Sequence, residues 1–392
     1  KAHRKFLTKF LRSFDTNIIL TGEPSKPERY AQYLNHFRKQ ITKLNSDENA
    51  SKPYWDLLQT PLQPLKDNLE FATYETFEAD PIKYNKYQEA IERCLNDFKL
   101  KQNNNNNNDK SKHIVLMVLG AGRGPLVQRA INASNKTGVL IKIYAIEKNP
   151  HAIVILKTKQ KYIWKNMVKI IQTDMRVWNP PEKADIIVSE LLGSFGDNEL
   201  SPECLDGAQK VLKPNGICIP KNYQNYIVPI SNGNTWNKLD KTPKDFELPY
   251  VINLVSHDIL SDIKKVWKFS HPNKNIKLNN AHNVRYKNIK FKINKDSIIH
   301  GFAGYFDSVL YKDVMLSIHP KTMDIHCKGM FSWFPIWFPL IKPINVNKND
   351  IISFHIWRKT DNTQVWFEWC ITNPILTQIH NINHRSYSVK LS

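Results

Sequence analysis

The sequence predicts an α/β protein in which a doubly wound parallel sheet is followed by an antiparallel β domain. The first observation is the apolar run Ile114–Leu119, which is too short for a helix and breaks on Gly120, Gly122 and Gly124. A strand, a glycine turn and a helix in that order form the nucleotide-binding corner of such a sheet. The second is the alternation of apolar runs with helical segments up to residue 189. The third is a change, from about Pro220, to short alternating runs separated by Asn, Pro and Lys turns.

The composition limits the class of protein. A length of 392 residues predicts two domains or slightly more. There is no apolar run of membrane-spanning length and no signal peptide, so no membrane association is expected. The five cysteines lack metal or disulfide spacing, which predicts free thiols in a reducing compartment. The net charge of +20 favours an anionic partner. We give it little weight, because the lysines are scattered among many asparagines, including the run Asn103–Asn108.

The first 44 residues predict a basic amphipathic helix over 1–13, a short strand over Asn17–Thr21 and a second helix over 27–44. These elements are too few to enclose a core. The segment is therefore expected to be the end of a domain that begins outside this chain, followed by a polar linker over 45–52.

A helix is expected from Pro81 to about Phe98, with Asp80 as its N-terminal cap. Apolar residues recur along it at helical spacing, at Tyr84, Tyr87, Ala90, Ile91, Cys94, Leu95 and Phe98. Residues 99–113, which include the asparagine run, are expected to form a flexible loop. Ordinary core packing alone would explain three aromatic residues of this region, Tyr74, Phe77 and Tyr84.

Four strands are expected next, at 114–119, 141–146, 168–173 and 184–189, with helices from 125 and from 150. Ligands of such a sheet gather beyond the carboxyl ends of its strands. Candidate binding residues follow each strand, namely Gly120, Glu147, Asp174 with Met175, and Glu190. Any one of them could be a turn or cap residue, but four in register favour a site.

The glycine corner departs from the dinucleotide fingerprint, because Pro125 stands where a third glycine is expected. Glu147 ends the second strand, where a ribose diol requires a carboxylate acceptor. The corner therefore favours an adenosine ligand that lacks a pyrophosphate.

Glu190 and Glu199 bracket a loop that contains Gly193 and Gly196. The surrounding acidic segment, residues 182–206, has a net charge of −6 within a basic protein. Its acids are Glu182, Asp185, Glu190, Asp197, Glu199, Glu203 and Asp206. An acidic patch suits a cationic substrate, and two converging carboxylates match the planar fork of a guanidinium group.

Eight stretches carry a resemblance to a known family: Pro61–Leu65, Phe77 with Asp80–Tyr84, Val118–Val127, Glu147–Pro150, Ser189–Phe195, Asp197–Ala208, His300–Phe306 and Met330–Pro335. They closely resemble the type II, or PRMT five-like, protein arginine N-methyltransferases, which form symmetric dimethylarginine. The resemblance covers nearly the whole chain. It implies a class I methyltransferase with a Rossmann-like parallel sheet over 51–219 and an antiparallel β-sandwich or barrel over 220–392. It also implies a remnant of an N-terminal TIM barrel over 1–50.

The resemblance implies S-adenosylmethionine as the cofactor. Its methionine end would lie against Tyr74, Lys83, Tyr84, Gly120 and Gly122. Glu147 would bind the ribose hydroxyls, while Asp174 and the Met175 backbone would meet the adenine.

Glu190 and Glu199 resemble the family's paired catalytic glutamates, which grip the substrate guanidinium. Phe77 resembles the residue that sets the symmetric product. Trp333 resembles the aromatic that stacks on the arginine, with Ser332 beside it in the substrate site. Only the resemblance points to Ser332 and Trp333.

The implied partners are arginine-rich proteins, such as histone tails and RG-rich RNA-processing proteins, in the cytoplasm and nucleus. A homo-oligomer is expected, as is a WD-repeat partner bound through the N-terminal barrel. Two alternatives stay open from the sequence. One is a nucleic-acid methyltransferase, suggested by the net charge, and the other is a non-catalytic methyltransferase-like scaffold.

Overall fold

The computed structural model describes residues 27–40, 51–104, 113–165, 167–240 and 242–392, together with Leu7, Leu11, Ile19 and Leu44. The chain divides into two compact units, Lys1–Leu57 and Leu58–Ser392. The first contains helix α2 (Pro27–Gln40), which confirms a helix in this region, and the short 3-10 turn η1 (Lys52–Tyr54). The helix predicted over 1–13 and the strand predicted over 17–21 lie almost wholly outside the described residues.

The second unit contains a five-stranded sheet in the order β3-β2-β1-β4-β5, in which all neighbouring strands are parallel. Its strands are β1 Ile114–Leu119, β2 Ile141–Glu147, β3 Val168–Gln172, β4 Ala184–Ser189 and β5 Leu212–Ile219. The first four confirm the prediction. Strand β5 was not predicted, because Pro214, Asn215 and Gly216 interrupt its apolar pattern with residues typical of a turn.

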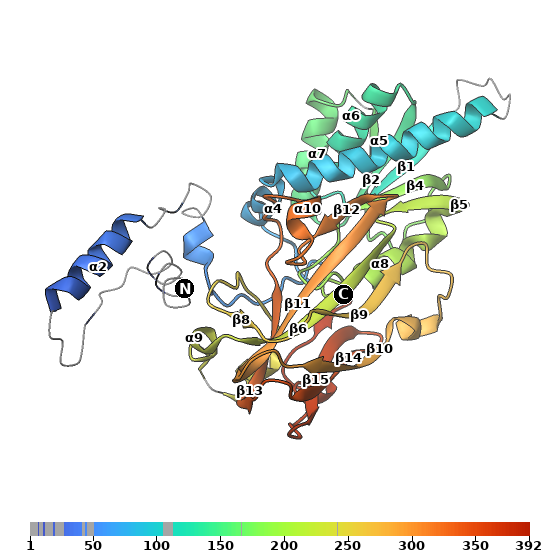
Figure 1. Ribbon diagram of the computed structural model, residues 1–392. Helices are drawn as coiled ribbons and strands as arrows, with labels where there is room; N and C mark the ends of the chain where they lie inside the picture. The colour runs from blue at the N-terminus through green and yellow to red at the C-terminus, as the bar shows by residue number, and fades with distance from the viewer. Residues whose placement is uncertain are drawn as a thin grey trace. The chain divides into compact units, whose positions relative to one another are not determined.

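Helices gather around this sheet (Figure 1). They are α4 Phe71–Glu78, α5 Pro81–Asn104, α6 Pro125–Thr137, α7 Pro150–Tyr162 and α8 Ser201–Ala208, which leads into the 3-10 turn η2 Gln209–Val211. Asp80 caps α5 as predicted, since its Oδ1 accepts the N–H of Ile82 at 2.9 Å. Helix α5 runs six residues beyond the predicted end at Phe98, so the loop expected over 99–113 begins later than predicted.

The rest of the chain forms two antiparallel sheets in its described part. The larger contains β6 Asn222–Ser231, β7 Tyr250–Val251, β8 Asp258–Ile259, β9 Lys264–Ser270, β11 Ser297–Tyr311, β12 Val314–Ser317 and β13 Ile336–Val346. The smaller contains β10 Arg285–Lys292, β14 Ile351–Thr360, β15 Gln364–Asn373 and β16 Val389–Lys390. Short helices connect the strands: α9 Gly233–Trp236, η3 Pro243–Glu247, η4 Leu278–Asn283, α10 Met323–His326 and η5 Ile382–His384.

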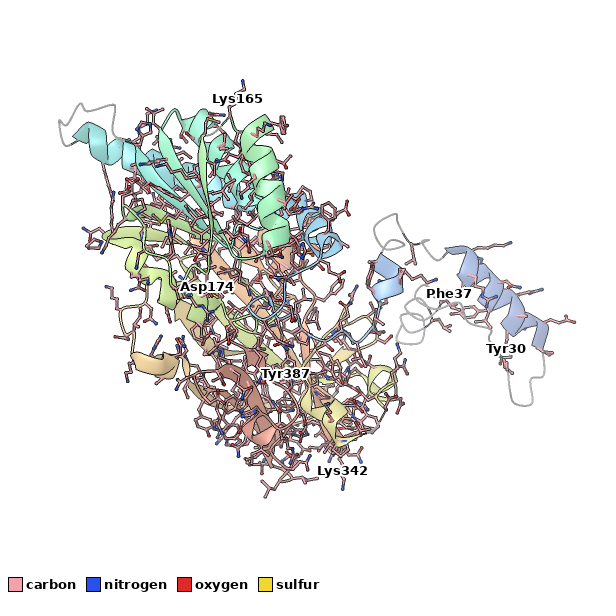
Figure 2. All side chains as sticks on the ribbon, turned by 180° about the vertical axis from the view of Figure 1, so that it is seen from behind. Tyr30, Phe37, Lys165, Asp174, Lys342 and Tyr387 are labelled. Carbon is pink, nitrogen blue, oxygen red and sulfur yellow. The ribbon has the colours of Figure 1, made fainter. Side chains whose placement is uncertain are left out.

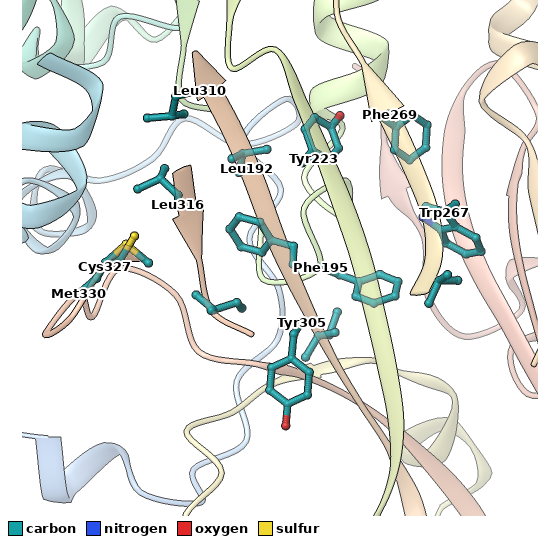
Figure 3. Packing of buried hydrophobic residues seen from close by; sticks show 14 of the residues in the cluster. Leu192, Phe195, Tyr223, Trp267, Phe269, Tyr305, Leu310, Leu316, Cys327 and Met330 are labelled. Carbon is teal, nitrogen blue, oxygen red and sulfur yellow. The ribbon is translucent and has the colours of Figure 1, made fainter. Parts of the chain in front are cut away.

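Phe195 joins the loop after β4 to the β domain (Figure 3). Its buried ring makes edge contacts with Trp267, Phe338 and Phe367, at centroid distances of 6.0, 5.4 and 5.9 Å. A Cβ atom at Gly304 would lie 2.6 Å from the Phe195 ring, so strand β11 requires glycine where the ring approaches it. The loop between Glu190 and Glu199 is therefore packed into the β domain.

All five cysteines are free and buried, which confirms the prediction of free thiols. Within the described ranges, no helix combines the length and the apolar character that crossing a membrane requires.

Candidate active site

The glycine loop, Gly120–Gly124, folds around the carboxylate of Glu147. Glu147 Oε2 accepts the N–H of Gly122 at 2.8 Å, and Oε1 accepts the N–H of Asn149 at 2.7 Å. Gly120 and Gly122 have φ values of 69° and 52°, in the left-handed region that favours glycine. A Cβ at Gly122 would lie 3.0 Å from the ring of Tyr74. The ends of β1 and β2 therefore meet, and the ring of Tyr74 lies against the loop.

Burial raises the pKa of Glu147, although backbone donors from Asn149 and Gly122 pull it down. A carboxylate offers about four acceptor sites, so with backbone donors from Asn149, Gly122 and Lys148 it still has room for a further donor, such as a ribose hydroxyl. The hydroxyl of Tyr74 accepts a bond from Asn149 Nδ2 at 3.1 Å. Burial and the nearby charge of Glu147 raise the pKa of Tyr74 to about 12, so it stays a neutral hydroxyl.

Asp174, labelled in Figure 2, follows β3. Its carboxylate already accepts from Arg176, with Nη2 at 2.6 Å from Oδ2. Burial acts to raise the pKa of Asp174, but the bonds from Arg176 outweigh it, so the pKa is lowered. The next side chain, Met175, would lie 3.6 Å from a Cβ placed on Gly120. The third strand end therefore approaches the first, and sequence reasoning missed Arg176 as a partner of Asp174.

The ammonium group of Lys83 lies at the centre of a set that we call the Lys83 cluster: Lys83, Glu190, Phe77, Tyr84 and Trp333. The Lys83 side chain is 1% exposed, and its Nζ is 3.4 Å from Glu190 Oε2. Its Nζ is also 5.5, 4.8 and 5.0 Å from the ring centroids of Phe77, Tyr84 and Trp333. A carboxylate and three aromatic faces surrounding one buried cation form an environment that stabilises positive charge.

Glu199 lies close enough to this cluster to respond to its charges. Burial raises the pKa of Glu199 to about 8, with a further rise from Glu190 and an opposing effect from Lys83. Among the described residues, Glu199 has no hydrogen-bond or ion-pair partner of its own. Glu190 is therefore paired with the Lys83 ammonium, whereas Glu199 is not, and the site lacks one positive charge when both carboxylates are ionised.

The family model described as PRMT5 arginine-N-methyltransferase matches residues 45–219, and the model described as PRMT5 oligomerisation domain matches residues 222–389. The chain belongs to the PRMT5 family.

Similar proteins include protein arginine N-methyltransferase 5 of Xenopus laevis, which is 44% identical over 403 residues, covering 100% of this chain and 62% of that protein. The protein of the same name from Oryza sativa subsp. japonica is 48% identical over 420 residues, covering 100% of this chain and 63% of the relative. The chain thus spans about three fifths of the length of these relatives.

Two solved structures are similar in fold. One is the Trypanosoma brucei PRMT1 enzyme-prozyme heterotetrameric complex with AdoHcy, with a TM-score of 0.61 and 14% identity, covering 82% of this chain and 99% of that one. The other is protein arginine methyltransferase 10 of Arabidopsis thaliana, with a TM-score of 0.59 and 15% identity, covering 82% and 98%. Together with the sheet order, they confirm the predicted class I methyltransferase fold followed by an antiparallel β domain.

In this PRMT5-family chain, the prediction of an acidic patch across residues 182–206 is wrong in extent. Cations from outside the segment pair with most of its acids. The ion pairs are Glu182 with Lys142, Asp185 with Lys213, and Asp197 and Glu203 with Arg358, while Asp206 Oδ2 lies 2.7 Å from the imidazole Nε2 of His282. Of the two remaining acids, Glu190 pairs with Lys83 and Glu199 responds to the charges of both, so the negative charge that a cationic ligand could meet is local to the Lys83 cluster.

Asp80 connects the Lys83 cluster to the segment that carries Ser332 and Trp333. Besides capping α5, its buried carboxylate accepts three bonds through Oδ2: from the N–H of Phe331 at 2.8 Å, and from the N–H and Oγ of Ser332 at 2.9 and 2.7 Å. Trp333 Nε1 donates to the Leu192 carbonyl at 2.7 Å. Sequence reasoning assigned Asp80 only the capping role, because nothing in the sequence pairs it with residues 331 and 332.

Proposed function

We propose that this chain catalyses type II protein arginine N-methylation. It would transfer methyl groups from S-adenosylmethionine to guanidinium nitrogens and give monomethylarginine and symmetric dimethylarginine. The observation that carries the proposal is the Lys83 cluster, where one carboxylate and three rings surround a cation, together with a second carboxylate, Glu199, that is close enough to respond to its charges. The Trypanosoma brucei relative was solved with AdoHcy, the demethylated form of S-adenosylmethionine, which supports the same cofactor here.

The residues at the strand ends fit this cofactor. The glycine loop admits a close approach of backbone to ligand, and Glu147 has fixed oxygens ready to accept from a ribose diol. Asp174 offers a carboxylate for an adenine amino group. The methionine carboxylate would give Lys83 a second acceptor beside Glu190, with Tyr74 and Tyr84 packed nearby.

The reaction requires the attacking nitrogen, the methyl group and the sulfur to lie nearly in line, so positioning supplies much of the catalysis. Glu190 and Glu199 would hold the guanidinium and keep electron density on the attacking nitrogen. Trp333 would stack on the guanidinium plane, while Phe77 limits its orientation. The nitrogen loses its proton after the methyl group arrives, to one of the glutamates or to water.

Two features disfavour the alternatives. A nucleic acid would bring phosphates toward Glu190 and Glu199, which repel them. A scaffold would gain nothing from burying Lys83 and Glu147, because burying charged groups costs free energy.

The match to an oligomerisation domain supports a homo-oligomer. We also propose that its substrates are arginine-rich proteins, such as histone tails and RG-rich RNA-processing proteins. We propose a location in the cytoplasm and nucleus. A WD-repeat partner and a TIM-barrel origin for residues 1–50 stay predictions.

The function is tested by incubating the protein with methyl-labelled S-adenosylmethionine and two peptides that differ only in carrying Arg-Gly or Lys-Gly repeats. Label is expected in the arginine peptide alone. Equal labelling of both peptides, or transfer to an RNA oligonucleotide instead, would reject the proposal.

Replacing Glu147 by alanine is expected to weaken S-adenosylmethionine binding by about 1.5–3 kcal/mol, the range for a hydrogen bond to a charged group. Calorimetry measures the dissociation constant. Glu182→Ala is a matched control, because Glu182 is a glutamate of the same domain that pairs with Lys142. An unchanged dissociation constant for Glu147→Ala would remove Glu147 from the cofactor site.

Arginine binding should depend on pH through Glu199, whose pKa is about 8. Below pH 8 the carboxyl is mostly protonated and must lose its proton to pair with a guanidinium. The affinity for an arginine peptide should therefore rise by up to about tenfold per pH unit from pH 6 and level off above pH 8. Calorimetry at pH 7 in buffers of different ionisation enthalpy should detect proton release. Release that persists undiminished in Glu199→Gln would contradict this assignment.

A further inference from the structure

Arg358 is a fully buried cation in strand β14 of the β domain. Its side chain contacts the segment that follows β4. Its Nη1 and Nη2 donate to the two carboxylate oxygens of Glu203, each at 2.8 Å. Its Nε donates to Asp197, and Nη1 also donates to the carbonyl of Asn283 at 3.2 Å. One guanidinium therefore connects two carboxylates of the methyltransferase domain.

These two carboxylates bracket Glu199 in the sequence, since Asp197 precedes it by two residues and Glu203 follows it by four. Between them the backbone makes a tight turn, in which the N–H of Leu200 donates to the Asp197 carbonyl at 3.2 Å. Leu200 has a φ of 70°, a strained conformation for a residue with a branched side chain, and α8 begins there without a side-chain cap. Such a turn persists only when its surroundings hold it.

The surroundings of Asp197 come from the β domain. Trp267 Nε1 donates to Asp197 Oδ1 at 3.2 Å, and Asn225 also donates to this carboxylate. Figure 3 shows Trp267 in the same packed region as Phe195. Buried ion pairs rarely stabilise a protein more than apolar packing would, but a bidentate fork fixes geometry. The distinctive contribution of Arg358 is therefore the geometry of the turn that presents Glu199.

We propose, on the basis of the proposed function, that Arg358 is a positioning residue for Glu199. Arg358 does not contact the substrate. It holds both ends of the Glu199 turn through Asp197 and Glu203, so that the carboxylate faces Glu190 and the incoming guanidinium. In this way the β domain sets the geometry of a carboxylate that the methyltransferase domain supplies.

The test compares Arg358→Lys with Lys359→Arg. Both variants keep the charge, but lysine cannot form the bidentate fork. Lys359 is the matched control, because it is the next residue of β14 and pairs with buried Glu368 on the opposite side of the strand. Arg358→Lys is expected to lower kcat/KM for an Arg-Gly peptide by roughly 10- to 100-fold, the cost of a small misplacement. S-adenosylmethionine affinity should stay within about twofold of the parent, and Lys359→Arg should match the parent in both measurements.

A double-mutant cycle separates positioning from general structural damage. In a Glu199→Gln background, Arg358→Lys is expected to change the residual rate by less than about twofold, because the group that it positions is gone. If the rate losses caused by Glu199→Gln and Arg358→Lys multiply in the double variant, the proposal is overturned. An unchanged kcat/KM in Arg358→Lys would overturn it as well. If Arg358→Lys does not fold, Glu203→Gln, which weakens the same fork, takes its place in the cycle.

Hydrogen exchange gives a readout that does not depend on methyl transfer. The amides of Leu200 and Cys204, which donate to the carbonyls of Asp197 and Leu200, should exchange at least tenfold faster in Arg358→Lys than in Lys359→Arg. Equal exchange would overturn the proposal. A parent protein that methylates nothing would reject the proposed function, while exchange at these amides would still show whether Arg358 holds the turn.

Discussion

Replacing Glu199 by glutamine is expected to lower the methylation rate by at least about 100-fold, the usual effect of removing one electrostatic contact to a transition state. Glutamine keeps the shape of the side chain but cannot balance the guanidinium charge. Glu190→Gln should lower the rate to a similar extent. Cofactor affinity should stay largely intact in both variants, because Glu147 and Asp174, which we propose bind the adenosine, are unchanged.

The two variants should differ in stability. Glu190 is the ion-pair partner of buried Lys83, and removing one partner of a buried pair costs about 3–5 kcal/mol. Glu199 instead has a pKa that is raised from 4.5 to about 8 in the folded protein. Between these two pH values the unfolded chain loses this proton more readily than the folded protein does, so folding becomes less favourable as the pH rises. Glu199→Gln removes that penalty and should be at least as stable as the parent above pH 8.

Steady-state rates, calorimetry with S-adenosylmethionine and thermal unfolding at two pH values measure these effects. Glu182→Gln is the control, because Glu182 pairs with Lys142 outside the Lys83 cluster. If either variant methylates arginine at the parental rate, its glutamate is not catalytic.

Replacing Phe77 by methionine is expected to admit asymmetric dimethylarginine beside the symmetric form. Symmetric dimethylation requires the arginine to rebind with its unmethylated terminal nitrogen facing the sulfonium. The Phe77 and Trp333 rings both lie in the Lys83 cluster, and a rigid ring can select that orientation by shape. Methionine is flexible and fills space adaptably, so it should relax the selection. A tenfold change in product ratio requires only about 1.4 kcal/mol between competing transition states.

Phe71→Met is a matched control for Phe77→Met, because Phe71 lies in the same helix but packs against Arg123, 4.1 Å from its ring centroid. It should leave the product ratio unchanged. If Phe77 only packs the helix, its replacement should lower stability and rate without changing the isomers. Chromatography of the hydrolysed product separates them. An active, folded Phe77→Met protein that makes only symmetric dimethylarginine would refute the steric explanation.

Local patterns were sufficient to predict four of the five parallel strands and the edge where their candidate residues meet. Ile114–Leu119 is a buried apolar strand, and the glycines after it bring Gly122 to Glu147. Such features depend on neighbours in the sequence, so a single sequence contains them. The same is true of Asp80 as a helix cap.

Contacts between distant segments could not be predicted in this way. Arg358 lies 155 residues from Glu203 and neutralises it, so the count of acids in residues 182–206 overstated the charge available to a substrate. The second role of Asp80 requires residues 331 and 332, which only the tertiary fold brings near. The family resemblance pointed to Ser332 and Trp333, because related proteins with the same fold bring the corresponding segments together.

The most direct test of the proposed function is the identity of the methylated amino acid. The full-length protein, incubated with labelled S-adenosylmethionine and an Arg-Gly-rich peptide, should yield monomethylarginine and symmetric dimethylarginine after hydrolysis. Label recovered as asymmetric dimethylarginine, or in no arginine derivative, would contradict the proposal that the Lys83 cluster and Glu199 form a type II arginine site.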